Sequence, residues 1–169
     1  HHQIAHSLEN EELPLYRRFG YGTSAFSEGW ALYSEQLALE AGLAPDPYDE
    51  LGILQSEIFR AVRLVVDTGI HYKKWTREKA IAYMKSKTGM SDTECRVEIE
   101  RYIVWPGQAL SYKVGMIKIL ELREKAMNAL GDKFDIKDFH SAVLDHGNPP
   151  LFIVEQKIDE MIAKNLNTN

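Results

Sequence analysis

The sequence predicts an all-α fold, in which a single helical domain of about eight helices spans residues 1–169. Three observations lead to this prediction. Apolar residues recur at three- and four-residue spacings along most of the chain. No run of Val, Ile and Thr alternates with polar residues for long enough to indicate a strand. Capping signals separate the helical stretches by short connections, and no repeat, low-complexity segment or linker indicates a second domain.

The first four helices are predicted at residues 2–11, 23–41, 48–71 and 76–87. Pro14 stops the first helix, and Gly42 is a natural C-terminal stop for the second. Thr76 is the expected N-cap of the fourth helix. The third helix carries an apolar stripe at helical spacing. Its members are Leu51, Leu54, Ile58, Val62 and Val65.

The second half of the chain also begins its helices at recognisable signals. Ser91-Asp92-Thr93-Glu94 is a capping box, and Pro106 suits the first turn of a long helix that runs to Leu130 and stops at Gly131. Asp135 is expected to cap a helix that ends near His146. Pro149-Pro150 is expected to start the last helix, which fades into a polar tail at residues 167–169.

The composition is that of an ordinary globular protein, 44% hydrophobic and 27% charged over 169 residues. A net charge of -5 gives no basic footprint, so no nucleic-acid partner is expected. No apolar run approaches the roughly 20 residues that span a bilayer. The single cysteine, Cys95, excludes an internal disulfide and is expected to be incidental.

The opening histidines and a later glutamate have the chemistry of zinc ligands. Zinc favours imidazole nitrogen and carboxylate oxygen, and a catalytic site keeps three protein ligands and one open position. His1 or His2 could supply one ligand and Glu28, on the next long helix, another. Glu35 shares a helix face with Glu28 and could accept a hydrogen bond that orients a histidine. The alternatives are a remnant purification tag at His1-His2 and a solvated or salt-bridged Glu28.

Several segments together resemble a known family. They are residues 1–3, 25–37, 63–71, 75–80, 106–115, 134–136 and 139–140. In this order they are similar, over nearly the whole chain, to the C-terminal part of a bacterial family catalogued as domain of unknown function 885. That family is similar to helical zinc peptidases, and its members are several hundred residues long. They carry a His-Glu-Ala-x-Pro-Gly-His-His segment, of which only the final histidines are present here.

The resemblance implies a zinc cofactor with His1 or His2 and Glu28 as two of its ligands. It implies that Tyr112 and His71 stabilise the transition state by binding a developing oxyanion. Glu35 and Asp67 are expected to contact these site residues and hold them in position. The first histidine and the general-base glutamate belong to the segment that this chain lacks.

The expected function is therefore the C-terminal half of a zinc-dependent peptidase or related hydrolase, inactive as the 169-residue chain alone. The alternative is a helical peptide-binding or interaction domain without catalytic activity. The expected partners are a peptide substrate and the upstream half of the same protein. A homodimer through an apolar surface that the upstream half would otherwise cover is also expected. Family resemblance favours an exported or cell-envelope location.

Overall fold

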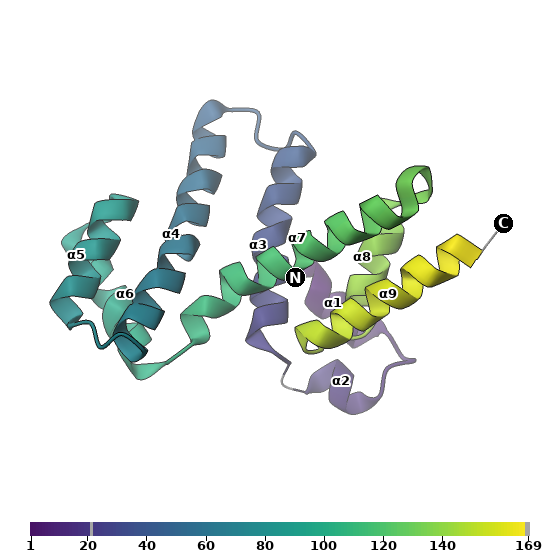
Figure 1. The fold of residues 1–169 in the computed structure, drawn as a ribbon, viewed down its shortest axis with the longest axis horizontal. Helices are drawn as coiled ribbons and strands as arrows, with labels where there is room; N and C mark the ends of the chain where they lie inside the picture. Colours follow the sequence, from purple (N-terminus) through teal and green to yellow (C-terminus); the bar gives the residue numbers. More distant parts are fainter. Residues whose placement is uncertain (21, 168–169) are drawn as a thin grey trace. The chain divides into compact units, whose positions relative to one another are not determined.

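The computed structural model describes residues 1–20 and 22–167, and every regular element within them is a helix (Figure 1). The all-α prediction is confirmed. Tyr21 and the end of the predicted polar tail, residues 168–169, lie outside the described residues. The helices are α1 (His2–Glu9), α2 (Leu15–Phe19), α3 (Ser24–Glu40), α4 (Pro47–His71), α5 (Arg77–Thr88), α6 (Asp92–Val104), α7 (Ser111–Leu130), α8 (Ile136–Leu144) and α9 (Leu151–Asn167), with two 3-10 turns, η1 (Gln108–Leu110) and η2 (Gly131–Lys133).

The chain divides into two compact units, and the second is inserted in the first. The first unit comprises His1–Trp30 and Val114–Asn169, and the second comprises Ala31–Lys113. Helices α3 and α7 each run from one unit into the other, because the boundaries fall inside them. Among the described residues, no helix is both long and apolar enough to cross a membrane.

In the second unit, α4, α5 and α6 pack against one another around a small apolar core. Val62 and Val66 lie one turn apart on α4 and are buried. The other buried members of this core are Ala80, Met84, Cys95, Ile99, Tyr102 and Ala109. Gly69 of α4 leaves room for the indole of Trp75, since a Cβ at Gly69 would lie 2.6 Å from the Trp75 ring. The core fixes the C-terminal half of α4, which carries most of the polar residues described below.

In the first unit, α8 packs on α9, and α1 packs on both α2 and α8. The start of α3 approaches α7 closely through two glycines. A Cβ on Gly29 would lie 2.4 Å from the Cα of Gly115, so neither position has room for a side chain. This contact places the α3 turn that carries Glu28 against the backbone of α7. The buried apolar side chains of the unit include Phe26, Trp30, Ile119, Leu122, Phe139, Val143, Val154 and Ile158.

The predicted helix starts are confirmed where a side chain caps the helix. Thr76 accepts from the backbone N–H of Lys79, and Asp135 accepts from that of Lys137. Ser91 and Glu94 form the reciprocal capping box, with each side chain accepting from the backbone N–H of the other. Each bond satisfies a donor of the first helical turn, so local sequence decides these boundaries.

Two predicted boundaries differ from the structure. The long helix α7 begins at Ser111 rather than at Pro106, because Gly107 adopts a left-handed conformation (φ 81°) and a 3-10 turn follows it. The short helix α2, at Leu15–Phe19, was not predicted; it begins directly after Pro14, whose fixed φ suits the position before a first helical turn.

Candidate functional site

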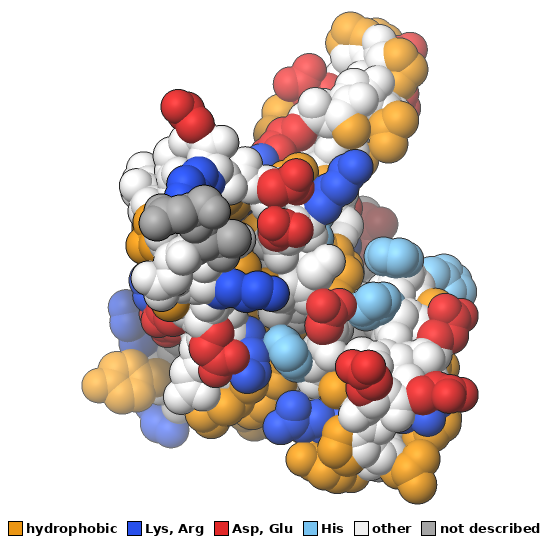
Figure 2. Space-filling model, turned by 90° about the vertical axis from the view of Figure 1, so that its right-hand side faces the viewer, with side chains coloured by type: hydrophobic (Ala, Val, Ile, Leu, Met, Phe, Trp, Pro, Cys, Tyr) orange, Lys and Arg blue, Asp and Glu red, His pale blue; other side chains and the backbone are white. Residues whose placement is uncertain are grey.

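The predicted metal-ligand histidines lie on the exposed side of α1 in the first unit. His1 is the N-cap residue and His2 the first helical residue, and both are exposed, whereas Gln3 and Ser7 face inward. The rings of His2 and His6 are 6.2 Å apart, and His6 Nε2 lies 2.7 Å from an Asp145 carboxylate oxygen. Figure 2 shows histidine side chains gathered close to acidic ones on one face.

Glu28 lies in the first unit too, in the second turn of α3. Its side chain is partly exposed. Within the described part of the chain it has no hydrogen bond or ion pair, although most other partly buried carboxylates of this protein are paired. Its neighbour Gly29 is buried against Gly115 of α7. Glu28 is therefore a carboxylate without a partner among the described residues, on a helical turn whose backbone is held by close packing against α7.

No three His, Cys, Asp or Glu side chains within residues 1–20 and 22–167 are grouped so that they could hold a metal ion. In the metal-site prediction, this chain supplies only two of the ligands, one histidine and Glu28. It stays a prediction, and so does the choice between His1 and His2.

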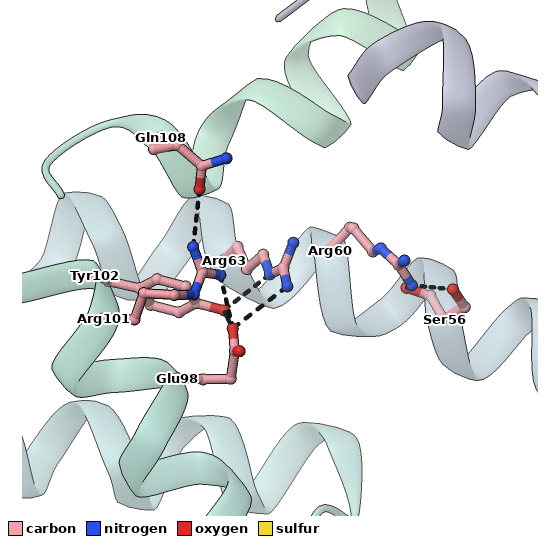
Figure 3. A network of polar contacts seen from close by, with 7 residues as sticks. All are labelled: Ser56, Arg60, Arg63, Glu98, Arg101, Tyr102 and Gln108. Carbon is pink, nitrogen blue, oxygen red and sulfur yellow. Dashed lines mark hydrogen bonds and ion pairs between the residues drawn. The ribbon is translucent and has the colours of Figure 1, made fainter. Parts of the chain in front are cut away.

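The second unit holds a network of polar side chains centred on Arg63 of α4 (Figure 3). Arg63 is buried, with 6% of its surface exposed. Its Nε donates to the Tyr102 hydroxyl at 2.8 Å, and its Nη2 donates to Glu98 Oε2 at 3.3 Å. The Tyr102 hydroxyl donates to the same Glu98 oxygen at 2.5 Å. Glu98, on α6, thus accepts from Arg63 of α4 as well as from side chains of its own helix, and joins the two helices.

The network continues in both directions from this centre. Arg101 donates to Glu98 at 2.8 Å and to the side-chain oxygen of Gln108 at 2.9 Å, which connects α6 to η1. Towards the other end of α4, Arg60 donates to Ser56 and lies 3.8 Å from Glu35 of α3.

Glu35 also accepts from the Ser56 hydroxyl at 3.0 Å. The partners of Glu35 in the second unit are therefore a serine and an arginine of α4. Among the described residues Glu35 contacts no histidine, and its predicted role in orienting one stays a prediction.

Tyr112, at the start of α7, lies over two of these arginines. The Arg63 guanidinium is 4.6 Å from the centre of the Tyr112 ring and 4.1 Å from that of Phe59, so aromatic rings flank it. The Arg60 guanidinium is 6.0 Å from the Tyr112 ring. The Tyr112 hydroxyl has no hydrogen bond within the described chain. It is free to donate to a ligand.

Asp67 and His71 hold the segment that leads to Tyr112. The buried Asp67 carboxylate accepts from the Gly107 N–H at 3.2 and 3.1 Å. His71 Nε2 lies 2.9 Å from the Tyr102 carbonyl oxygen; a carbonyl only accepts, so Nε2 carries the hydrogen. Asp67 thereby fixes the turn at Gly107, and His71 fixes the C-terminal end of α6.

The surroundings of the network shift two ionisation equilibria. Burial opposes ionisation of the Glu98 carboxyl, but hydrogen bonds from Arg101 and Tyr102 outweigh it and hold the pKa of Glu98 below its usual value. Burial and the hydrogen bond to Glu98 raise the pKa of the Tyr102 hydroxyl well above its usual value. Glu98 is therefore ionised and Tyr102 neutral at neutral pH.

Within the second unit, Arg63 and Tyr102 connect Tyr112 to His71 through contacts, and Asp67 bonds to the Gly107 N–H five residues before Tyr112. The first unit contains His1, His2 and Glu28. Sequence reasoning missed Arg63, Glu98, Tyr102 and Arg101. One signal was available: Arg63 and Asp67 lie four residues apart and each directly follows a valine, so two charged residues interrupt an apolar helix face.

The sequence matches the family described as bacterial protein of unknown function (DUF885) over residues 1–158. A crystal structure of a putative lipoprotein from Colwellia psychrerythraea is similar at a TM-score of 0.93 and 53% identity, over 97% of this chain and 28% of that one. A putative lipoprotein of unknown function from Shewanella oneidensis is similar at a TM-score of 0.84 and 30% identity, over 92% of this chain and 28% of that one. None of the curated proteins matches the chain. The chain spans a little over a quarter of the length of both structures.

Proposed function

We propose, from the premise that this chain belongs to the bacterial DUF885 family, that it forms the C-terminal part of a metal-dependent hydrolase that acts on peptides. In this proposal the chain contributes one histidine, His1 or His2, and Glu28 as metal ligands. It contributes Tyr112 and His71 as the groups that bind the developing negative charge.

The observation that carries the proposal is the state of Glu28. It is a partly buried carboxylate with no partner among the described residues, on a turn of α3 that Gly29 holds against α7. Because this carboxylate is partly exposed and unpaired among the described residues, it can bind a cation without first leaving another partner. The exposed histidines of α1 belong to the same unit.

The donors of this chain fit zinc in kind, since imidazole and carboxylate are both zinc ligands. This chain supplies two of the three protein ligands that a catalytic zinc site uses. The third ligand and the general base would come from residues outside this chain, as the greater length of both similar structures allows. A bound zinc ion would polarise the scissile carbonyl and lower the pKa of its water to about 7.

In the proposed reaction, the residues of this chain bind and orient the substrate. The Tyr112 hydroxyl is unbonded and its ring is packed on the Arg63 guanidinium, so the hydroxyl can donate to an oxyanion without first leaving another acceptor. Asp67 supports this arrangement through Gly107, five residues before Tyr112 along the chain. His71 donates through Nε2 to a backbone carbonyl, so it would bind the developing negative charge through Nδ1 in the protonated form, in which both ring nitrogens donate.

Two further proposals concern the setting of the protein. Both similar structures are described as putative lipoproteins, which favours an exported or cell-envelope location for this chain. Leu51, Leu54 and Ile58 are exposed along one side of α4, at 59%, 49% and 45%. We expect the remainder of a longer chain, or a second copy, to cover such a surface.

The test is peptide cleavage by the longest natural polypeptide that contains this sequence. The expected result is cleavage that a chelator abolishes and added zinc restores. Tyr112→Phe should lower kcat about 100-fold with KM nearly unchanged, because the hydroxyl acts on charge that develops only in the transition state. Tyr72→Phe is the control, since Tyr72 is 83% exposed. Peptide binding without cleavage would replace the proposal with the non-catalytic binding domain.

A further inference from the structure

Two arginines of α4 bury donor atoms that have no acceptor. Nη1 of Arg63 and Nε of Arg60 are both inaccessible to solvent and without a hydrogen bond among the described residues. The Arg63 side chain is 7% exposed and that of Arg60 23% exposed. Buried donors of a charged group are rarely left unpaired, because their hydration is lost without replacement.

These two donors belong to one place on α4. Arg60 and Arg63 lie three residues apart, which puts them on the same helix face. Both guanidinium groups lie beside the ring of Tyr112, whose hydroxyl is also unbonded in the described chain. Two arginine donors without acceptors therefore belong to guanidinium groups that lie beside one aromatic ring.

The charges of the cluster favour a singly charged anion. Arg63 and Arg101 share the carboxylate of Glu98. Asp67, the buried carboxylate nearest along α4, accepts from a backbone N–H instead. Arg60 has a carboxylate at 3.8 Å, in Glu35, but its Nε does not bond to it. The arginines of this network thus outnumber the carboxylates that pair with them by one.

We propose that Arg60 and Arg63, beside the Tyr112 ring, form a carboxylate-binding subsite whose ligand is the free C-terminal carboxylate of a peptide. A carboxylate has two oxygens, each able to accept two hydrogen bonds, so one group can accept from both donors. Both donor atoms are inaccessible in this structure, so the ligand enters when the partly exposed Arg60 side chain turns outward. The choice of a peptide rests on the proposed function; the anion site itself does not.

The experiment measures binding to the longest natural polypeptide that contains this sequence, with no metal added and no cleavage required. The probes are N-acetyl-dialanine with a free C-terminus, its C-terminal amide, the α-amide of N-acetyl-aspartate, whose only carboxylate is its side chain, and inorganic phosphate. Isothermal titration gives the affinities, and the Nε–Hε signals of the arginines in a ¹⁵N spectrum report the site. We expect the free acid to bind and to shift the Arg60 signal, and the amide to bind at least about tenfold more weakly.

The variants separate the site from general attraction to positive charge. Arg60→Lys keeps the charge but removes the Nε–H donor and should weaken the acid about tenfold. Arg77→Lys, in the same unit and ion-paired with Glu100, is the matched control and should change nothing. If Arg60→Lys does not fold, as circular dichroism would show, Arg60→Gln is the substitute, and it should weaken the acid at least as much, because it removes the charge as well as the Nε–H donor.

Equal binding of the acid and the amide would overturn the proposal, as would an unchanged affinity in Arg60→Lys. Stronger binding of phosphate or of the aspartate probe than of the peptide acid would overturn the C-terminal assignment. Binding as expected in a protein that cleaves no peptide would support the subsite and contradict only the hydrolase. Cleavage by a protein that binds the acid and the amide equally would support the hydrolase and contradict only the subsite.

Discussion

An alanine at position 115 tests how the start of α3 is held in the first unit. The new Cβ would lie 1.8 Å from the Ala25 carbonyl oxygen and 2.7 Å from the Cα of Gly29. Both atoms belong to the backbone of α3, so no side chain can turn away to make room. The two helices must separate by more than about 1 Å before ordinary contact distances return. Glu28, directly before Gly29, would move with α3.

The expected loss of stability follows from two opposing effects. Overpacking costs about 1–3 kcal/mol, and a clash of backbone with backbone belongs at the upper end. Replacing glycine by alanine inside a helix returns about 1 kcal/mol. We therefore expect Gly115→Ala to lower the free energy of unfolding by about 2 kcal/mol, measured by urea denaturation. Thermal melting should show a Tm lower by about 4–8 °C.

Gly52→Ala is the matched control, because Gly52 is also helical and a Cβ there meets no atom within 4 Å. It should keep or raise the Tm, since it gains helix propensity without strain. A Gly115→Ala protein as stable as the Gly52→Ala protein would show that α3 and α7 do not approach as closely as described.

The remaining predictions concern the second unit. Ser91→Ala should lower the free energy of unfolding by about 1 kcal/mol in urea denaturation, because it removes the capping-box acceptor of α6. Asp67→Asn should cost about 1–3 kcal/mol and expose the amide of Gly107 to faster hydrogen exchange, because the charged acceptor is lost. The stability due to ionised Glu98 is present above the ordinary glutamate pKa and is lost as pH falls through its lower folded pKa. Denaturation curves from pH 6 to pH 3 should therefore be less pH-dependent for Glu98→Gln, and identical slopes would refute the paired carboxylate.

The sequence predicted the fold where residues close in the chain determine it. Thr76, Ser91 and Asp135 cap helices through contacts within three residues, and their positions were predicted correctly. The predicted start of α7 was wrong because the observed start depends on Asp67, which lies forty residues away from Gly107 along the chain. Local propensity favours continuing the helix from Pro106, and a tertiary hydrogen bond prevents it.

The candidate site shows the same division between local and distant information. Residue types and the family resemblance indicated Glu28, His71 and Tyr112. The Arg63–Glu98–Tyr102 network could not be predicted, because its ion pair and hydrogen bonds join α4 to α6. A charged residue on an apolar face signals that a partner is needed, but only the packing of the helices shows which residue it is.

The central claim is that Glu28 is a metal ligand. The most direct measurement is the metal content of the longest natural polypeptide that contains this sequence, beside Glu28→Gln and a control variant, Glu124→Gln. Glu124 is an exposed carboxylate of α7 that has no hydrogen bond or ion pair within the described chain. The account predicts one zinc per chain in the natural protein and in Glu124→Gln, and loss of zinc in folded Glu28→Gln. Zinc retained in full by Glu28→Gln, or no metal in the folded natural protein, would contradict it.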